Sequence, residues 1–373
     1  MKKLLLVLAV LVALGVVAGC AGSTKSDSGS TKSGGGEPSE PVPTGPGADV
    51  VLYNQGVSWV KKGNIVRAEE RFRLATQANA GNLDAWFNLG VSLHRLGRYT
   101  EAEEAFRRYM VTRPDDPKAQ AGLGSALAAS GRGGQAISVF QAAIAKNPDD
   151  LTARNNLGAV YLAMNRSDDA EREFREVIAK DVSFADAHIN LAECYARRGK
   201  VGMAVTILTN TLKIAPDNAA LHNNLGRYYV TLEEWGEARN AFQKAVSVDP
   251  SNGAALANLG AIQLRLNQAT QALGTLQSAV AADPYNAVAQ ANLGAALRAN
   301  GQPKEAKKAL ETAIARDPGL AEAYLNLAVL YEQDLGDKAQ ALVNYQKYWQ
   351  YAQSKRQKNE LVPEWIKALQ GGS

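Results

Sequence analysis

The tripeptide Asn-Leu-Gly returns at one fixed interval through most of this chain. Full copies end at Gly90, Gly158, Gly226, Gly260 and Gly294, and close variants end at Gly56, Gly124, Ala192 and Ala328. The third residue of each copy falls at steps of 34 residues, eight times in succession, without insertion or deletion. Such a register predicts a repeat protein, in which each unit is one supersecondary element that stacks on its neighbours.

Each unit carries the pattern of two amphipathic helices. If the glycine of the tripeptide is position 8, the units begin at residues 49, 83, 117, 151, 185, 219, 253, 287 and 321. Positions 4, 7, 8 and 11 are spaced as one helical face, and so are positions 20, 24, 27 and 28. The chain is therefore expected to be all-α.

Turn and cap residues separate these helices. A glycine, or asparagine at Asn165 and Asn267, stands between the two helices of a unit, where a left-handed residue is expected. A proline follows the second helix in most units, and an Asp or Asn then caps the next helix. The predicted N-caps are Asp116, Asp150, Asn218, Asn252 and Asn286.

The unit resembles the tetratricopeptide repeat (TPR) family. In one unit the family pattern is met by Leu225, Gly226, Tyr229, Ala238, Phe242, Ala245 and Pro250. The resemblance covers residues 49–353 as nine repeats, the ninth with one extra residue around Asp334. It implies a right-handed superhelical solenoid of helix-turn-helix units. Position 4 departs from the family, because it is Trp only at Trp86.

The first 48 residues predict an exported, lipid-anchored protein. Lys2 and Lys3 precede an apolar run that is too short to span a bilayer, which describes a signal peptide over residues 1–19. Val17-Ala18-Gly19-Cys20 resembles the lipobox of bacterial lipoproteins, which implies diacylglycerol on Cys20 and no other cofactor. Ala21 favours the outer membrane, facing the periplasm. Residues 20–48 form a predicted flexible tether rich in Gly, Ser and Pro.

The last segment, residues 354–373, differs from the repeat. Leu361, Trp365, Ile366 and Leu369 form a short apolar face, and Pro363 suits the start of a helix. We expect this helix to cap the end of the stack, since an open stack exposes apolar surface. A helix that docks on a partner is the alternative.

Little in the sequence suggests catalysis, a metal or nucleic acid. The formal net charge of +4 is too small to favour nucleic acid. His188 and His222 share position 4 of successive units but lack a third ligand, so a structural role is expected for them. Cys194 reads as a small buried residue. The repeats leave no room for a catalytic domain, and the chain is predicted not to be an enzyme.

Asparagine at position 6 is the leading candidate for binding. In the resembling family the first helix of each pair lines a concave groove, and an asparagine column in some relatives holds the backbone of a bound segment. The alternative is that this asparagine only stabilises the helix pair. The column contains Asn54, Asn88, Asn156, Asn190, Asn224, Asn258, Asn292 and Asn326, with Gly122 as the exception.

Neighbouring positions give the predicted groove its character. It is expected to begin with apolar residues, chiefly Tyr53 and Phe87, and to become polar around Arg197 and Arg227, which are expected to contact acidic partners. Further along, four alanines are expected to leave it shallow: Ala257, Ala261, Ala291 and Ala295.

These features predict a non-enzymatic scaffold for protein–protein interaction in the bacterial envelope. It would recruit or assemble partners of a machine such as a type IV pilus, a motility system or a secretion system, by gripping extended peptide segments. Two alternatives stay open: a scaffold of polysaccharide synthesis or export that contacts glycan, and a regulator of an envelope enzyme. Few aromatic residues in the groove favour protein over glycan.

Overall fold

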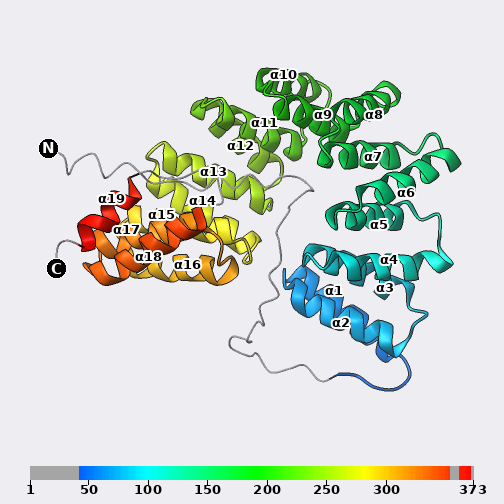
Figure 1. Ribbon diagram of the computed structural model, residues 1–373, viewed down its shortest axis with the longest axis horizontal. Helices are drawn as coiled ribbons and strands as arrows, with labels where there is room; N and C mark the ends of the chain where they lie inside the picture. Colours follow the sequence, from blue (N-terminus) through cyan, green and yellow to red (C-terminus); the bar gives the residue numbers. More distant parts are fainter. Residues whose placement is uncertain (1–41, 353–360, 371–373) are drawn as a thin grey trace. The chain divides into compact units, whose positions relative to one another are not determined.

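A computed structural model of the chain describes residues 42–352 and 361–370, and these residues form nineteen α-helices and no strand (Figure 1). The predicted signal peptide, Cys20 and most of the predicted tether lie outside the described residues. Within the part that is described, no helix is both long enough and apolar enough to cross a membrane.

The chain divides into two compact units, with the division at residue 207 inside α10 (Val201–Leu212). We call them the N-terminal unit (described residues 42–207) and the C-terminal unit (described residues from 208 onward). The N-terminal unit contains α1 (Ala48–Lys61), α2 (Ile65–Ala78), α3 (Leu83–Arg95), α4 (Tyr99–Thr112), α5 (Pro117–Ala129), α6 (Gly133–Lys146), α7 (Leu151–Ala163), α8 (Ser167–Lys180) and α9 (Ala185–Arg197).

The C-terminal unit continues the same alternation of helices. It contains α11 (Ala219–Thr231), α12 (Trp235–Val248), α13 (Gly253–Arg265), α14 (Ala269–Ala282), α15 (Ala287–Ala299), α16 (Pro303–Arg316), α17 (Ala321–Gln333), α18 (Lys338–Ala352) and α19 (Val362–Gln370). In both units each helix packs on the next one in sequence, and first helices of neighbouring repeats also touch, as α5 touches α7 and α13 touches α15. This is a solenoid of helix pairs, as the repeat predicts.

The predicted turns and caps are confirmed. Asn165 and Asn267 have φ of 59° and 58°, in the left-handed region, and five of the predicted turn glycines also have positive φ. All five predicted N-caps accept a backbone N–H with the side chain; Asp116, for example, accepts from Lys118 and Ala119.

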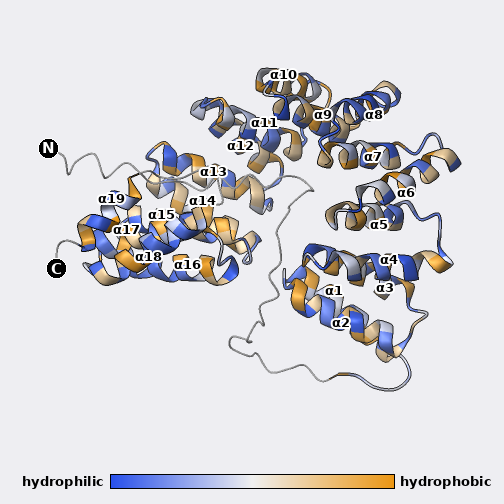
Figure 2. Cartoon of the chain, in the orientation of Figure 1, coloured by the Kyte–Doolittle hydropathy of each residue, from blue (hydrophilic) through white to orange (hydrophobic). Residues whose placement is uncertain are grey.

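The core of each helix pair explains the glycine of the tripeptide. In α7 a Cβ on Gly158 would lie 2.5 Å from the ring of Phe174, and in α11 one on Gly226 would lie 2.6 Å from the ring of Phe242. Both rings are buried, with 0% and 1% exposure. The position-24 side chain therefore rests directly on the backbone of the first helix. Figure 2 shows that hydrophobic and hydrophilic residues share the same helices in both units, as amphipathic packing requires.

The last repeat is irregular, as expected, and a further helix follows it. Gly336, with φ of 70°, lies in the longer turn between α17 and α18. Helix α19 packs on α18: Val362 is fully buried, and the ring of Trp365 lies 5.5 Å from that of Tyr345. These contacts cover apolar residues of the last repeat, including Tyr345, with an apolar helix face.

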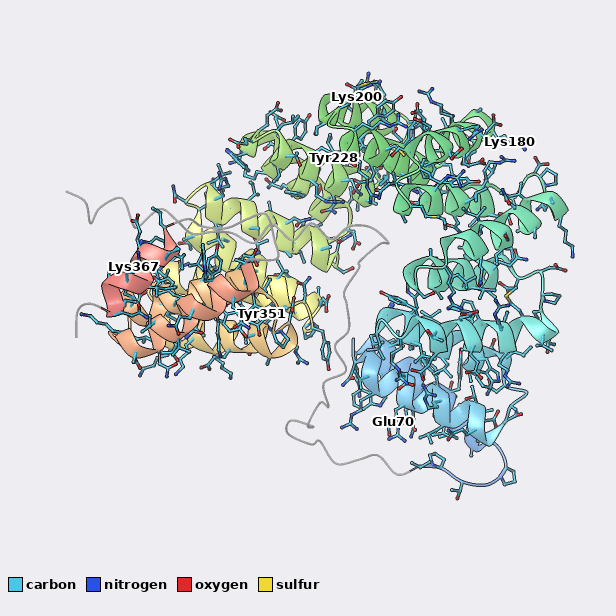
Figure 3. All side chains as sticks on the ribbon, viewed as in Figure 1. Glu70, Lys180, Lys200, Tyr228, Tyr351 and Lys367 are labelled. Carbon is cyan, nitrogen blue, oxygen red and sulfur yellow. The ribbon has the colours of Figure 1, made fainter. Side chains whose placement is uncertain are left out.

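Ion pairs join successive repeats of the N-terminal unit. Glu69 of α2 lies 3.3 Å from Arg98 in the turn before α4, and Glu103 of α4 pairs with Arg132 in the turn before α6. Lys180, labelled in Figure 3, lies 2.6 Å from Asp149 of the preceding repeat. The repeat pattern alone does not predict this seam. In the Glu69–Arg98 and Glu103–Arg132 pairs, its signal is Glu at position 21 followed by Arg at position 16 of the next repeat.

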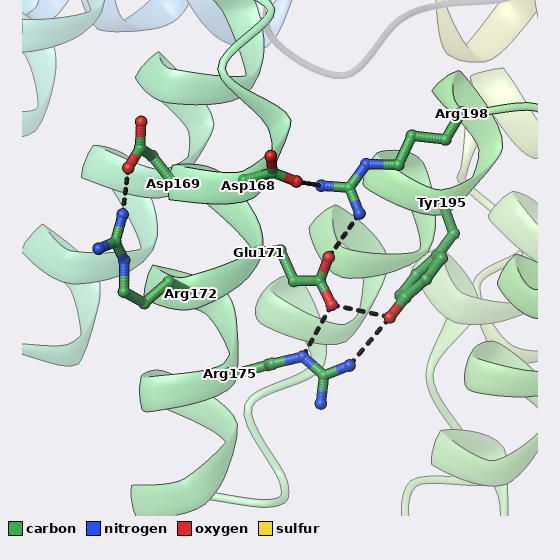
Figure 4. A network of polar contacts seen from close by, with 7 residues as sticks. All are labelled: Asp168, Asp169, Glu171, Arg172, Arg175, Tyr195 and Arg198. Atoms are coloured by element: carbon green, nitrogen blue, oxygen red, sulfur yellow. Dashed lines mark hydrogen bonds and ion pairs between the residues drawn. The ribbon is translucent and has the colours of Figure 1, made fainter.

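The seam is most developed between α8 and α9 (Figure 4). The Arg198 guanidinium, just after α9, lies 2.6 Å from both Glu171 and Asp168 of α8. The Tyr195 hydroxyl donates to Glu171 at 2.8 Å, and Arg175 donates to both Tyr195 and Glu171 at 2.9 Å. Each oxygen of the Glu171 carboxylate thus has a charged or hydroxyl donor.

Candidate functional site

The predicted asparagine column lies on the first helix of each repeat, but its members differ in exposure. Asn54 of α1 is exposed, whereas Asn258 of α13 and Asn292 of α15 are buried, with 9% and 1% exposure. The other members are partly exposed: Asn88, Asn156, Asn190, Asn224 and Asn326. The column is therefore not one uniform surface.

Two members of the column link neighbouring repeats. Asn190 donates its side-chain N–H to the side-chain oxygen of Asn155 at 3.1 Å, and Asn258 donates in the same way to Asn223 at 3.0 Å. In both pairs a position-6 amide bonds to a position-5 amide of the preceding repeat. These two contacts match the stabilising role that sequence analysis left open, and they occupy one donor of each amide.

Four other members make no side-chain hydrogen bond to a neighbouring repeat. Asn88 and Asn224 each donate to a carbonyl of their own helix, at Asp84 and Ala220, both at 2.9 Å. The side chains of Asn54 and Asn156 make no hydrogen bond with other described residues. Among the partly or fully exposed members, Asn54 and Asn156 thus have their amide groups open to a ligand.

An apolar patch accompanies these asparagines in the first two repeats. Tyr53, Val57, Phe87 and Val91, which we call the apolar patch, are partly exposed and pack on the core from one side. The Phe87 ring lies 5.9 Å from Phe106 and 5.5 Å from Tyr109, and the Tyr53 ring lies 5.8 Å from Phe72. The two aromatic members are thus supported by rings beneath them.

The two predicted groove arginines have partners within their own unit. Arg197 of α9 donates to Glu193 at 2.9 Å and to the carbonyl of Leu162 at 3.0 Å. Arg227 of α11 donates to the side-chain oxygen of Asn224 at 2.8 Å. Both guanidinium groups thus already have hydrogen-bond partners, so an acidic ligand would have to share or replace these hydrogen bonds.

The four alanines predicted to form a shallow groove wall are buried. Their exposures are 6% for Ala257, 1% for Ala261, 0% for Ala291 and 6% for Ala295. Ala257, Ala291 and Ala295 belong to buried clusters that join successive repeats of the C-terminal unit. The prediction that these alanines line an open groove is wrong, because small side chains at positions 5 and 9 of these repeats pack into the interior.

Position 4, which departs from the family pattern, makes a recurring contact that the sequence does not predict. Five of its side chains reach back to the carbonyl of the residue six positions earlier, at the end of the preceding repeat, whereas Arg154 donates to Glu173 instead. The Trp86 ring N–H donates to Ala80 at 2.9 Å, and the Gln120 amide donates to Pro114 at 3.1 Å. The common property is a side-chain donor of sufficient length, not one residue type.

The two histidines at position 4 belong to this group. His188 Nε2 lies 2.9 Å from the Val182 carbonyl, and His222 Nε2 lies 2.8 Å from the Pro216 carbonyl. The structural role expected for them is thus explained by a contact. In the part of the chain that the structure describes, no group of three or more His, Cys, Asp or Glu side chains is placed to hold a metal.

Cys194 is fully buried, as predicted, and burial raises the pKa of its thiol to about 11. A thiol with such a pKa stays protonated at neutral pH and is a poor nucleophile.

Family models agree with the repeat pattern. Models described as tetratricopeptide repeat match residues 53–119 and 223–287, 127–183, 183–251, 287–330 and 322–354. Together these matches cover most of the chain from the first repeat to the last. Comparison with curated proteins gives no match.

Solved structures also contain similar solenoids. The APC/C hetero-tetramer Cut9-Hcn1 has a TM-score of 0.57 at 15% identity, over 86% of this chain and 76% of that chain. YrrB, described as a TPR protein with an unusual peptide-binding site, has a TM-score of 0.42 at 25% identity, over 52% and 97%. MamA from Desulfovibrio magneticus RS-1 has a TM-score of 0.41 at 23% identity, over 46% and 97%. The first of these shows a shared fold.

Proposed function

This chain belongs to the tetratricopeptide repeat family, and we propose that it is a non-enzymatic scaffold that binds extended segments of other proteins. The observation that carries the proposal is the surface of the first two repeats and α7. There the apolar patch and the open amide of Asn54 lie on α1 and α3, and the open amide of Asn156 lies two repeats further along, on α7. The apolar patch can contact side chains of an extended segment, and the asparagine amides can bond to its backbone. Recognition of the backbone does not depend on the sequence of the segment.

The proposed site lies in the N-terminal unit. In the C-terminal unit, by contrast, Asn258 and Asn292 are buried and the alanines beside them are interior residues. We therefore narrow the proposed binding residues to those of α1, α3, α5 and α7, and we assign Asn190 and Asn258 to the joining of repeats.

We further propose that Cys20 carries the lipid anchor and that the scaffold works in the bacterial envelope, most simply at the outer membrane facing the periplasm. The support is the lipobox-like sequence before Cys20 and the tether-like composition after it. Among envelope machines, pilus or motility assembly is the first to test, followed by secretion.

The test is co-purification of partners with the full-length tagged protein from detergent-solubilised envelopes. Asn54→Ala combined with Asn156→Ala should reduce recovery of a bound protein about tenfold, because two amide contacts are lost. The matched control, Gln77→Ala with Gln141→Ala, removes exposed amides from the second helices α2 and α6 and should leave recovery unchanged. Equal recovery with all three proteins would contradict binding at this surface.

A further inference from the structure

The apolar patch has uncommitted positive charge at one end. Lys61 and Arg95 are the last residues of α1 and α3, and both side chains are exposed. Neither makes a hydrogen bond or an ion pair with other described residues. Each follows a patch valine by four residues, Val57 or Val91, so cation and valine share one face of their helix.

This combination is confined to the first two repeats of the N-terminal unit. At the same position 13, α5 and α7 have Ala129 and Ala163. In α9 the equivalent Arg197 is held by Glu193 and by the Leu162 carbonyl. The two unpaired cations, Lys61 and Arg95, therefore lie on the same two helices as the partly exposed apolar patch.

The two repeats also form a continuous platform. Leu52 of α1 and Ala85 of α3 belong to one buried cluster, with Tyr53 packed against it. The rings of Tyr53 and Phe87 rest on buried rings, so little side-chain entropy is left to lose on binding. Charge and apolar surface are thus presented together by a preformed site.

We infer that the first two repeats recognise an extended segment in which apolar side chains are combined with acidic ones. The apolar side chains contact Tyr53, Val57, Phe87 and Val91, and the carboxylates contact Lys61 and Arg95. This inference rests on the proposed function and adds the chemistry of the partner to it. Charge complementarity of this kind raises the association rate and selects among partners that share an apolar motif.

The experiment measures fluorescence anisotropy of two labelled peptides of about twelve residues with the full chain in detergent. Both peptides carry leucine and phenylalanine at the same positions, and the intervening residues are aspartate in one and lysine in the other. Wild type should bind the aspartate peptide more tightly, and added NaCl should weaken the binding. Lys61→Glu with Arg95→Glu should lower that affinity about tenfold or more, whereas Arg108→Glu on α4 should not.

A neutral pair, Lys61→Gln with Arg95→Gln, separates recognition from an effect on the helix ends, where cations are also favourable. It should give an intermediate affinity with an unchanged melting temperature. Equal binding of both peptides, or no binding of either by wild type, would overturn the inference. Val57→Ala with Val91→Ala could lower the affinity for both peptides equally, while the charge reversal changes neither affinity. That result would overturn the acidic preference and leave binding at the apolar patch supported.

Discussion

At the scale of single residues, position 8 of the repeat is packed closely and holds glycine in seven of the nine repeats, with Ala192 and Ala328 in the other two. Its Cα faces the side chain at position 24, at Gly226 the ring of Phe242. Gly274, in the middle of α14, differs, because nothing lies within 4 Å of a Cβ placed there. The same substitution should therefore have opposite effects at these two sites of the C-terminal unit.

We expect Gly226→Ala to destabilise the protein by about 1–3 kcal/mol, because the ring of Phe242 must move to admit the methyl group. Gly274→Ala should stabilise it by about 0.5–1 kcal/mol, since alanine loses less backbone entropy in a helix. Urea unfolding followed by circular dichroism measures both. Destabilisation of similar size at both sites would show that the close contact with Phe242 is not the cause.

Residue identity predicted most of the fold, because each turn and cap depends on a local property. Asn165 and Asn267 were predicted in the left-handed turn since asparagine tolerates it, but Glu233, with φ of 59°, was not, since glutamate has no such preference. The exposure of Asn54 against the burial of Asn292 could not be predicted. It depends on how closely neighbouring repeats pack, and the repeat pattern is the same at both sites.

At the scale of elements, ion pairs between repeats stabilise the N-terminal unit. Position-21 glutamates of the N-terminal unit pair with arginines of the following repeat, and Glu171 has the largest set of donors. Burial alone would raise the pKa of Glu171, but hydrogen bonds from Tyr195, Arg198 and Arg175 outweigh it, and the pKa is lowered. The carboxylate therefore stabilises the folded state as long as it is ionised.

We expect Glu171→Gln to lower stability by roughly 1–3 kcal/mol at neutral pH, because charged hydrogen bonds to two arginines are weakened. Hydrogen exchange measured by mass spectrometry should show faster exchange in α8 and α9. The control is Glu176→Gln on the same helix, where the side chain is exposed and no partner is described. If α8 and α9 exchange hydrogen at the same rate in both variants, the Glu171 network does not stabilise these helices.

The same carboxylate gives the protein an acid dependence of known sign. Since its pKa is lower in the folded than in the unfolded state, its stabilisation is present above about pH 4.5 and is lost as pH falls through the folded-state pKa. Wild type should therefore lose more stability than Glu171→Gln between neutral and acid pH, when melting temperatures are compared. Parallel curves for the two proteins would contradict this assignment.

At the scale of the whole molecule, we propose a repeat array held at a membrane by Cys20, the first residue after processing. We expect Cys20→Ser to abolish incorporation of labelled palmitate and to move the protein from the membrane fraction to the soluble fraction, because the lipid requires a thiol. The comparison is Cys194→Ser, at a buried thiol. Palmitate labelling that persists in Cys20→Ser would refute the anchor while leaving the binding surface untouched.

The most direct test of the central claim is photo-crosslinking in intact cells with a photoreactive amino acid at single positions. Positions 54, 88 and 156 lie on first helices of the N-terminal unit, and positions 108 and 176 lie on the second helices α4 and α8. If the first helices bind an extended partner segment, the first three positions should crosslink to one protein and the last two should not. Crosslinks from 108 and 176 alone would place binding on the second helices and contradict the proposed site.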